Sequence, residues 1–171
     1  MQRYVHVYTG NGKGKSTASF GLAIRAAGAG LKTFIAQFVK GMPCSELVAL
    51  KRFADCITIR QFGRDRFITA APGKLDLSLA RNGFLEVQQA TLSGLYDVVI
   101  LDEINVATFL NLIPVDHLLN LISTRPSHVE LVCTGRYADP KVIARADLVT
   151  EMREVKHYYQ HGVQARSGIE N

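Results

Sequence analysis

Near its N-terminus the chain reads Thr9-Gly10-Asn11-Gly12-Lys13-Gly14-Lys15-Ser16-Thr17. A short run of β-branched and aromatic residues precedes this stretch at 4–8, and small and apolar residues typical of a packed helix follow it at 19–29. A strand, a glycine-rich turn and a helix in this order form the context of a phosphate-binding loop. Glycines at alternate positions permit positive φ angles, so we expect backbone N–H groups to turn inward at the positive end of the helix dipole. The stretch therefore predicts a site for a nucleotide triphosphate.

Two side chains of the loop suit this chemistry. Lys15 supplies a positive charge for phosphate oxygens, and Ser16 offers a hydroxyl ligand for Mg²⁺. The usual loop has its first glycine five residues before the second, and Thr9 stands at that position here. The loop is therefore either one residue shorter than usual or begins on threonine. The residues predicted to contact the nucleotide are Gly10, Asn11, Gly12, Lys13, Gly14, Lys15, Ser16 and Thr17.

The composition is that of a folded α/β protein. The chain has 171 residues, of which 47% are hydrophobic and 20% are charged, so we expect one domain spanning residues 1–171. The formal net charge is +5, but the lysines and arginines are scattered in runs no longer than two. This pattern favours a small anionic ligand over nucleic acid as the partner.

The cysteines indicate a reducing compartment. Cys44, Cys56 and Cys133 are odd in number, widely spaced and without a CxxC pair, which favours a cytoplasmic protein with free thiols over a disulfide framework or a structural metal. The sequence shows neither a signal-peptide pattern nor an apolar run long enough for a transmembrane helix, so we expect no membrane span.

A second strong motif lies at 96–103. Four consecutive apolar residues, 98–101, precede Asp102 and Glu103, and such a run is typical of a central parallel strand that is buried on both faces. A carboxylate at the end of such a strand is the expected metal partner of a phosphate-binding loop, and we assign this role to Asp102. Glu103 is predicted to join the metal site, to hold a ribose or to polarise water. The structural alternative for the pair is a strand-end cap.

Basic residues follow two further predicted strands. Lys40 comes after a strand at 32–38, and Arg136 comes after a strand at 129–133. Both lie at the edge where ligands bind in open parallel sheets. Lys40 is predicted to be either a second phosphate contact or an ordinary solvated lysine, and Arg136 a phosphate or ribose contact.

The remaining elements complete an α/β P-loop NTPase fold of the RecA-like type, with a mostly parallel sheet of about six strands flanked by helices. Residues 62–75 lack apolar periodicity and are predicted to form a functional loop or lid. Asp76 is predicted to cap the helix that follows. From residue 153 onward we expect an ordered but irregular tail. Further helices are predicted at 15–29, 45–53, 77–95, 115–123 and 140–146, and further strands at 57–61 and 148–152.

A phosphate-binding loop does not state which bond of ATP is broken. A kinase needs an acceptor hydroxyl, a base and an arginine-rich lid. The lid segment here is short, although it contains Arg64 and Arg66. A P-loop kinase or nucleotide hydrolase acting on a small molecule is therefore one alternative, and a nucleotide-gated carrier that delivers its cargo without turnover is another.

Several motifs together point to one family. They are the loop 9–17 with Arg25, and the segments 37–41, 101–105, 134–136, 146–152, 155–157 and 162–170. With these motifs the chain resembles the P-loop ATP:corrinoid adenosyltransferase family, which acts on cob(I)alamin or cob(I)yrinic acid a,c-diamide. The resemblance extends over nearly the whole chain.

The resemblance implies transfer of the 5′-deoxyadenosyl group of MgATP to the cobalt(I) of a corrinoid, with release of triphosphate, in cobalamin biosynthesis or salvage. ATP, Mg²⁺ and the corrinoid are then the ligands. Cobalt(I) attacks C5′ rather than phosphorus, and the charge that accumulates on the triphosphate is stabilised by Lys15, Ser16, the loop amides and Mg²⁺. The resemblance also implies that ATP lies in the loop in the sense opposite to that in kinases.

Roles for single residues follow from the same resemblance. Arg25 contacts phosphate, although its distance along the helix requires a bent-back side chain or a neighbouring subunit. Glu103 lies near the ribose or the metal, and Arg136 lines the nucleotide site. An aromatic side chain excludes the lower axial ligand of cobalt(II); we assign this to Phe67, while Phe62 either helps or anchors the core. A homodimer and a flavoprotein reductant are the expected partners.

Overall fold

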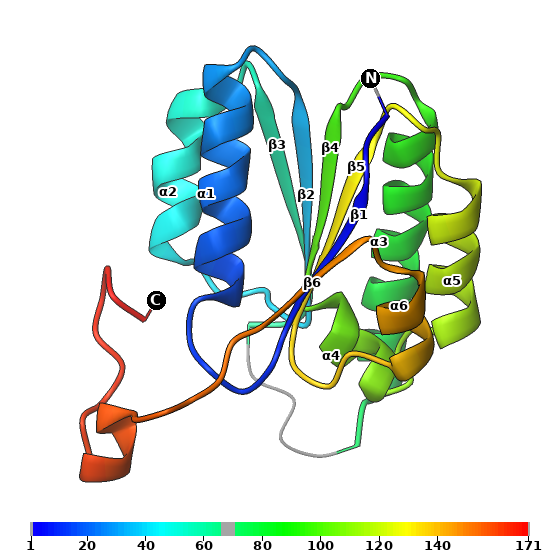
Figure 1. The fold of residues 1–171 in the computed structure, drawn as a ribbon. Helices are drawn as coiled ribbons and strands as arrows, with labels where there is room; N and C mark the ends of the chain where they lie inside the picture. Colours follow the sequence, from blue (N-terminus) through cyan, green and yellow to red (C-terminus); the bar gives the residue numbers. More distant parts are fainter. Residues whose placement is uncertain (1, 66–70, 171) are drawn as a thin grey trace.

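The computed structural model describes residues 2–65 and 71–170, and its centre is a six-stranded sheet (Figure 1). The strands are β1 (Val5–Thr9), β2 (Thr33–Phe38), β3 (Ile57–Phe62), β4 (Val98–Asp102), β5 (Glu130–Thr134) and β6 (Leu148–Glu151). They lie in the order β3-β2-β4-β5-β1-β6, and all pairs in the described chain are parallel. The predicted α/β fold with a largely parallel sheet, as in P-loop NTPases, is confirmed.

Helices cover both faces of the sheet (Figure 1). One face carries α1 (Lys15–Gly28) and α2 (Ser45–Leu50), which continues into a 3-10 turn at Lys51–Phe53. The other face carries α3 (Lys74–Leu92), α4 (Ile104–Phe109), α5 (Val115–Thr124) and α6 (Pro140–Arg145). Each parallel connection therefore packs a helix against the sheet, which leaves the carboxyl ends of the strands open on one side.

The two strands β2 and β4 are buried along their whole length, as the continuous apolar run of β4 predicts. Successive side chains alternate between the two helical layers. Ile35 and Ile100 pack in the cluster under α1, whereas Phe34 and Leu101 pack in the cluster on the opposite face. This packing fixes the carboxyl ends of both strands, where the polar residues stand.

The helix after the lid segment differs from its prediction. It begins at Lys74, three residues earlier than predicted, and ends at Leu92, three residues before the predicted end. Asp76 is therefore inside the first turn and is not the cap. Its carboxylate accepts the N–H of Gly73 at 2.8 Å and forms an ion pair with Arg64 at 2.6 Å. An acidic residue suits both the N-cap position of a helix and the capping-box position three residues later. The sequence alone therefore does not tell which of the two positions Asp76 takes.

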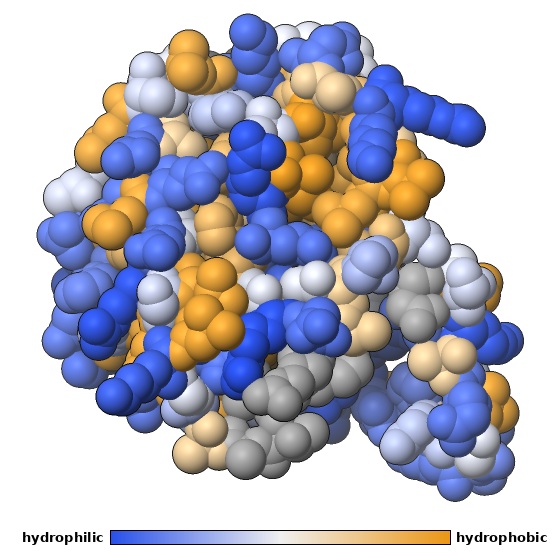
Figure 2. All heavy atoms as spheres, turned by 180° about the vertical axis from the view of Figure 1, so that it is seen from behind, coloured by the Kyte–Doolittle hydropathy of each residue, from blue (hydrophilic) through white to orange (hydrophobic). Residues whose placement is uncertain are grey.

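The face shown in Figure 2 is mostly hydrophilic, and apolar side chains gather on it in separate patches. The C-terminal segment stands off the body as a small lobe in Figures 1 and 2. It contains a short 3-10 helix at Tyr158–His161, in keeping with the irregular tail that was predicted. None of the helices in the described residues is both long and apolar enough to cross a bilayer.

Candidate active site

The glycine loop between β1 and α1 is shaped by contact with the chain that leaves β6. Gly10 and Gly14 have φ angles of 93° and 115°, which residues with a side chain rarely adopt. A Cβ atom on Gly10 would lie 2.4 Å from the carbonyl oxygen of Met152, and one on Gly12 would lie 2.7 Å from the same atom. The N–H of Gly12 donates to this oxygen at 2.7 Å. Glycine is therefore required at these positions, and the N–H of Gly12 does not turn into the loop as predicted.

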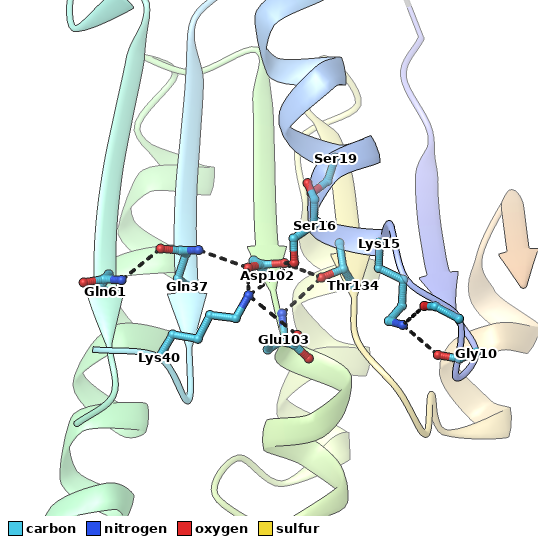
Figure 3. A network of polar contacts seen from close by, with 11 residues as sticks. Gly10, Lys15, Ser16, Ser19, Gln37, Lys40, Gln61, Asp102, Glu103 and Thr134 are labelled. Atoms are coloured by element: carbon cyan, nitrogen blue, oxygen red, sulfur yellow. Dashed lines mark hydrogen bonds and ion pairs between the residues drawn. The ribbon is translucent and has the colours of Figure 1, made fainter. Parts of the chain in front are cut away.

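Lys15 occupies the middle of the loop, where it is only 8% exposed. Its Nζ donates to the carbonyl oxygens of Gly10 at 2.8 Å and Gly12 at 2.7 Å (Figure 3). Burial lowers the pKa of Lys15; Glu103 acts in the opposite direction, and the charge of Arg136 lowers the pKa further. Phosphate oxygens in place of the neutral carbonyls would hold the ammonium in its charged form.

Asp102, the last residue of β4, is the centre of a polar network (Figure 3). The residue is fully buried. One carboxylate oxygen accepts hydrogen bonds from the hydroxyls of Ser16 and Thr134, each at 2.7 Å. The other accepts from Nε2 of Gln37 at 3.2 Å and from Nζ of Lys40 at 3.0 Å. The structure thus brings together residues of α1, β2, β4 and β5 with Lys40, which follows β2.

Glu103 faces the same region from the residue after β4. Its φ of 60° is left-handed, and its N–H donates to Oγ1 of Thr134 at 3.1 Å. Its Oε1 lies 3.7 Å from Nζ of Lys40. Burial raises the pKa of Glu103, Asp102 raises it further, and Lys40 opposes this rise. Glu103 also precedes α4, a helix that was not predicted because six residues are too few to show helical periodicity.

A cleft of about 320 Å³ opens at this edge of the sheet. Most of the predicted nucleotide contacts line it, namely residues 11–17, Lys40, Glu103 and Arg136. Gly10 contributes through the carbonyl oxygen that binds Lys15. The cleft therefore carries several cations beside a strand-end carboxylate, as a site for a polyanion requires.

Sequence reasoning missed four further residues that line the cleft: Glu46, His157, Ile169 and Glu170. The motifs at 155–157 and 162–170 contributed to the family resemblance, but no role was drawn from them. Glu46 lies in the first turn of α2 and belongs to no motif. Spatial proximity across the fold, which the sequence does not state, brings these residues to the site.

One predicted residue, Arg25, does not line the cleft, and another lies outside the described residues. Arg25 is exposed on the last turn of α1, where its charge acts on Tyr8 rather than on the glycine loop. This is the distance problem that its place along the helix predicts. Phe67 lies outside the described residues. Phe62 packs on Phe38 with ring centroids 5.9 Å apart, and a Cβ atom on Gly83 would meet its ring at 2.3 Å, so Phe62 anchors the core.

The residues present fit a magnesium ion. Among the described residues no three His, Cys, Asp or Glu side chains gather into a metal cage, but Mg²⁺ at nucleotide sites needs only one or two protein oxygens besides phosphates and water. The Ser16 hydroxyl and Asp102 carboxylate are 2.7 Å apart, and the ammonium of Lys40 contacts both. A cation is thus already accommodated between these oxygens.

A second pocket of about 280 Å³ adjoins the cleft and is more apolar. It shares Lys40, Glu46 and Glu170 with the cleft. Its apolar lining comes mainly from the segment after β2 and from the tail, and consists of Val39, Met42, Pro43, Cys44 and Ala165. The charged part of a ligand could therefore bind in the cleft while an uncharged part, or a second substrate, binds in the adjoining pocket.

The last residues of the C-terminal tail contact the glycine loop. Nζ of Lys13 donates to the carbonyl oxygen of Ile169 at 2.6 Å and lies 3.7 Å from Glu170. The Glu170 carboxylate also accepts from the hydroxyl of Tyr158 and from the N–H of Arg166 at 2.8 Å. Hydrogen bonds from Arg166 and Tyr158 lower the pKa of Glu170 to about 2. The carboxylate therefore ties the tail into one folded unit.

Glu170→Gln is expected to loosen this tail. The depressed pKa means that the ionised carboxylate stabilises the docked tail above the pKa of about 4.3 in an unfolded chain, and that this is lost as the pH falls towards 2. Tryptic cleavage between residues 153 and 166, followed by mass spectrometry at neutral pH, should become several-fold faster. Glu154→Gln is the control, since the Glu154 carboxylate accepts a hydrogen bond from the exposed side chain of Gln160 within the tail itself. Equal cleavage rates in the wild type and Glu170→Gln would show that the Glu170 carboxylate does not hold the tail in place.

Comparisons with known proteins identify the family to which the chain belongs. The profile of the family described as ATP:corrinoid adenosyltransferase BtuR/CobO/CobP matches residues 1–171. The chain is 34% identical to the corrinoid adenosyltransferase of Pseudomonas aeruginosa over 165 residues, which cover 96% of this chain and 81% of that protein. It is 32% identical to the corrinoid adenosyltransferase CobA of Salmonella typhimurium over 166 residues, which cover 96% and 83%. With a match of this extent, the chain belongs to the ATP:corrinoid adenosyltransferase family.

Proposed function

We propose that this protein transfers the 5′-deoxyadenosyl group of MgATP to the cobalt(I) of a corrinoid and releases triphosphate, in cobalamin biosynthesis or salvage. The observation that carries the proposal is the cleft lined by Lys15, Lys40 and Arg136 beside the glycine loop. Three cations suit a leaving group that carries the charge of a whole triphosphate. Membership of the family supports the same reaction and does not favour a kinase or a nucleotide hydrolase.

In this reaction cobalt(I) donates an electron pair to C5′, the bond from C5′ to its oxygen breaks, and the triphosphate leaves with the bonding electrons. Lys15 meets the developing charge, because a phosphate oxygen can replace the neutral carbonyl oxygens of Gly10 and Gly12. Mg²⁺, held by Ser16 and Asp102, supplies further positive charge to the triphosphate. Thr134 and Gln37 hold the Asp102 carboxylate in place through their hydrogen bonds.

Glu103 and Arg136 are assigned to the sugar and its adjoining phosphate, since both line the cleft. We propose that ATP lies in the loop with its γ-phosphate at the usual α position, so that C5′ faces outward. The adjoining pocket supports this arrangement, because Val39 and Met42 offer apolar surface next to the polar cleft. The uncharged part of a substrate would lie there.

The corrinoid is proposed to meet an aromatic side chain, Phe67, that excludes its lower axial ligand, and a flavoprotein is proposed to reduce the cobalt. A homodimer is part of the proposal, because Arg25 is exposed and distant from its own cleft and would reach phosphate from a second copy. The edge strand β6 also exposes Leu148 and Val149, each 42% exposed, as surface for that copy. The proposed compartment is the cytoplasm, in keeping with cysteines that are free.

The proposal is tested with purified protein, MgATP and chemically reduced cobalamin under anaerobic conditions. We expect the absorbance of cobalt(I) to disappear and a light-sensitive alkylcorrinoid to form, only when ATP is present. Binding of the corrinoid without alkylation would identify a carrier and contradict the proposal. The same assay with cob(I)yrinic acid a,c-diamide shows which acceptor is preferred.

A further inference from the structure

Lys40 is the one basic residue that the described contacts place directly on both candidate metal ligands. Its Nζ lies 3.0 Å from Oδ2 of Asp102 and 3.2 Å from Oγ of Ser16 (Figure 3). Oε1 of Glu103 is 3.7 Å away. The ammonium therefore stands among oxygen atoms that would otherwise face a metal ion.

The backbone around Lys40 is held tightly. Val39 has a φ of 64°, an unusual conformation for a β-branched residue and one that persists only where the surroundings enforce it. A Cβ atom on Gly63 would lie 2.4 Å from the backbone nitrogen of Lys40, and one on Gly41 would lie 2.3 Å from the carbonyl oxygen of Gly63. Two glycines thus clamp this segment against the chain after β3. Only the side chain of Lys40, a third of which is exposed, is left to move.

Lys40 supplies the positive charge that the buried carboxylate of Asp102 needs. Asp102 is fully buried, and a buried carboxylate without a positive partner is strongly unfavourable. Lys15 does not fill this need in the observed arrangement, since its Nζ is bound to the loop carbonyl oxygens of Gly10 and Gly12. The contacts of Gln37 and Thr134 with Asp102 are uncharged. Lys40 is thus the cation that balances Asp102.

We propose that Lys40 is an internal counter-ion which occupies the magnesium position while the nucleotide is absent and moves to the triphosphate when Mg²⁺ binds Ser16 and Asp102. This inference rests on the proposed function only in requiring a magnesium–polyphosphate ligand. Free metal is kept out by the ammonium, and the metal enters together with the phosphate groups that give Lys40 a new partner. Lys40 lines both the cleft and the adjoining pocket, so its side chain stays beside a triphosphate bound in the cleft.

The first test measures binding of Mn²⁺ alone by electron paramagnetic resonance, without nucleotide. Lys40→Gln removes the charge but keeps an N–H donor for Asp102, and Lys40→Met removes both. We expect each variant to bind Mn²⁺ at least about tenfold more tightly than the wild type, because a unit charge at this distance inside a protein outweighs a factor of ten. Lys13→Met is the control, since it removes an equal charge from the same cleft without touching Ser16 or Asp102. Equal Mn²⁺ affinity in the wild type and Lys40→Gln would overturn the proposal.

The second test measures binding of inorganic tripolyphosphate by calorimetry in the presence of Mg²⁺. Lys40→Gln should bind it about tenfold more weakly, the typical worth of one charge-assisted contact. Unchanged affinity would show that Lys40 does not move to the phosphates. Neither test involves a corrinoid or C5′, so both remain decisive if adenosyl transfer is not found.

Discussion

Lys15→Ala is expected to lower the rate of adenosyl transfer about a thousandfold while leaving the fold intact. A preorganised group aimed at charge that develops in the transition state typically contributes about 10²–10³ in rate. Lys15 is such a group, because two loop carbonyl oxygens hold its ammonium in the cleft before any substrate binds. Single-turnover absorbance with reduced cobalamin at saturating ATP measures the rate, and circular dichroism checks the fold.

Lys13→Ala provides a matched control in the same loop. It removes an equal charge, but Nζ of Lys13 donates to Ile169 of the tail at 2.6 Å rather than into the loop. We expect a loss of about tenfold at most, as for a partly exposed ion pair. Losses of the same size in the two variants, or a nearly normal rate in Lys15→Ala, would contradict the role given to Lys15.

Asp102→Asn is expected to have the second-largest effect, with transfer reduced at least about a hundredfold and the free energy of unfolding lowered by about 2 kcal/mol. The carboxylate accepts four hydrogen bonds in a fully buried position. An amide group would turn an N–H towards donors such as Ser16 and Thr134. It would also remove the nearer of the two carboxylates that pair with Lys40 and leave only Glu103, at 3.7 Å. This loss of stability is smaller than for a fully buried ion pair, because Lys40 is partly exposed and water can solvate its charge. Urea unfolding measures the loss of stability, and single-turnover absorbance measures the loss of transfer rate. Binding of Mn²⁺–ATP shows whether the metal is still held.

The control for this variant is Asp97→Asn, just before the same strand at its opposite end. Asp97 pairs with Arg3 at 2.9 Å and accepts the N–H of Lys32 at 2.9 Å. Its substitution should cost stability but leave the transfer rate unchanged. Asp102→Asn with normal Mn²⁺–ATP affinity would show that the metal is held elsewhere.

The grouping of Ser16, Lys40 and Asp102 could be predicted from the sequence, because carboxyl ends of parallel strands meet at one edge. The partners that hold Asp102 could not, since they depend on strand register. Gln37 is paired with Asp102 in the β2–β4 ladder, and Gln61 is paired with Gln37 in the β2–β3 ladder. Only that register creates the chain of side-chain amides that reaches the carboxylate from β3.

The features that the sequence did not predict are either short elements or contacts between residues far apart in the chain. A left-handed φ at Glu103 and a six-residue helix after it leave no periodic pattern. The contact of Lys13 with Ile169 joins residues 156 positions apart, and such contacts are decided by tertiary packing. The outward N–H of Gly12 has the same origin, because its acceptor, Met152, follows the last strand of the sheet.

The claim on which the account depends is that carbon, and not phosphorus, is attacked. ATP labelled with ¹⁸O at the oxygen between C5′ and the α-phosphorus tests this directly, with the products of one turnover on reduced cobalamin separated and weighed by mass spectrometry. The account predicts that the label leaves in intact triphosphate, because the C5′–O bond breaks. Label retained in ADP, AMP or adenosine would contradict it, because a bond to phosphorus would then have been broken.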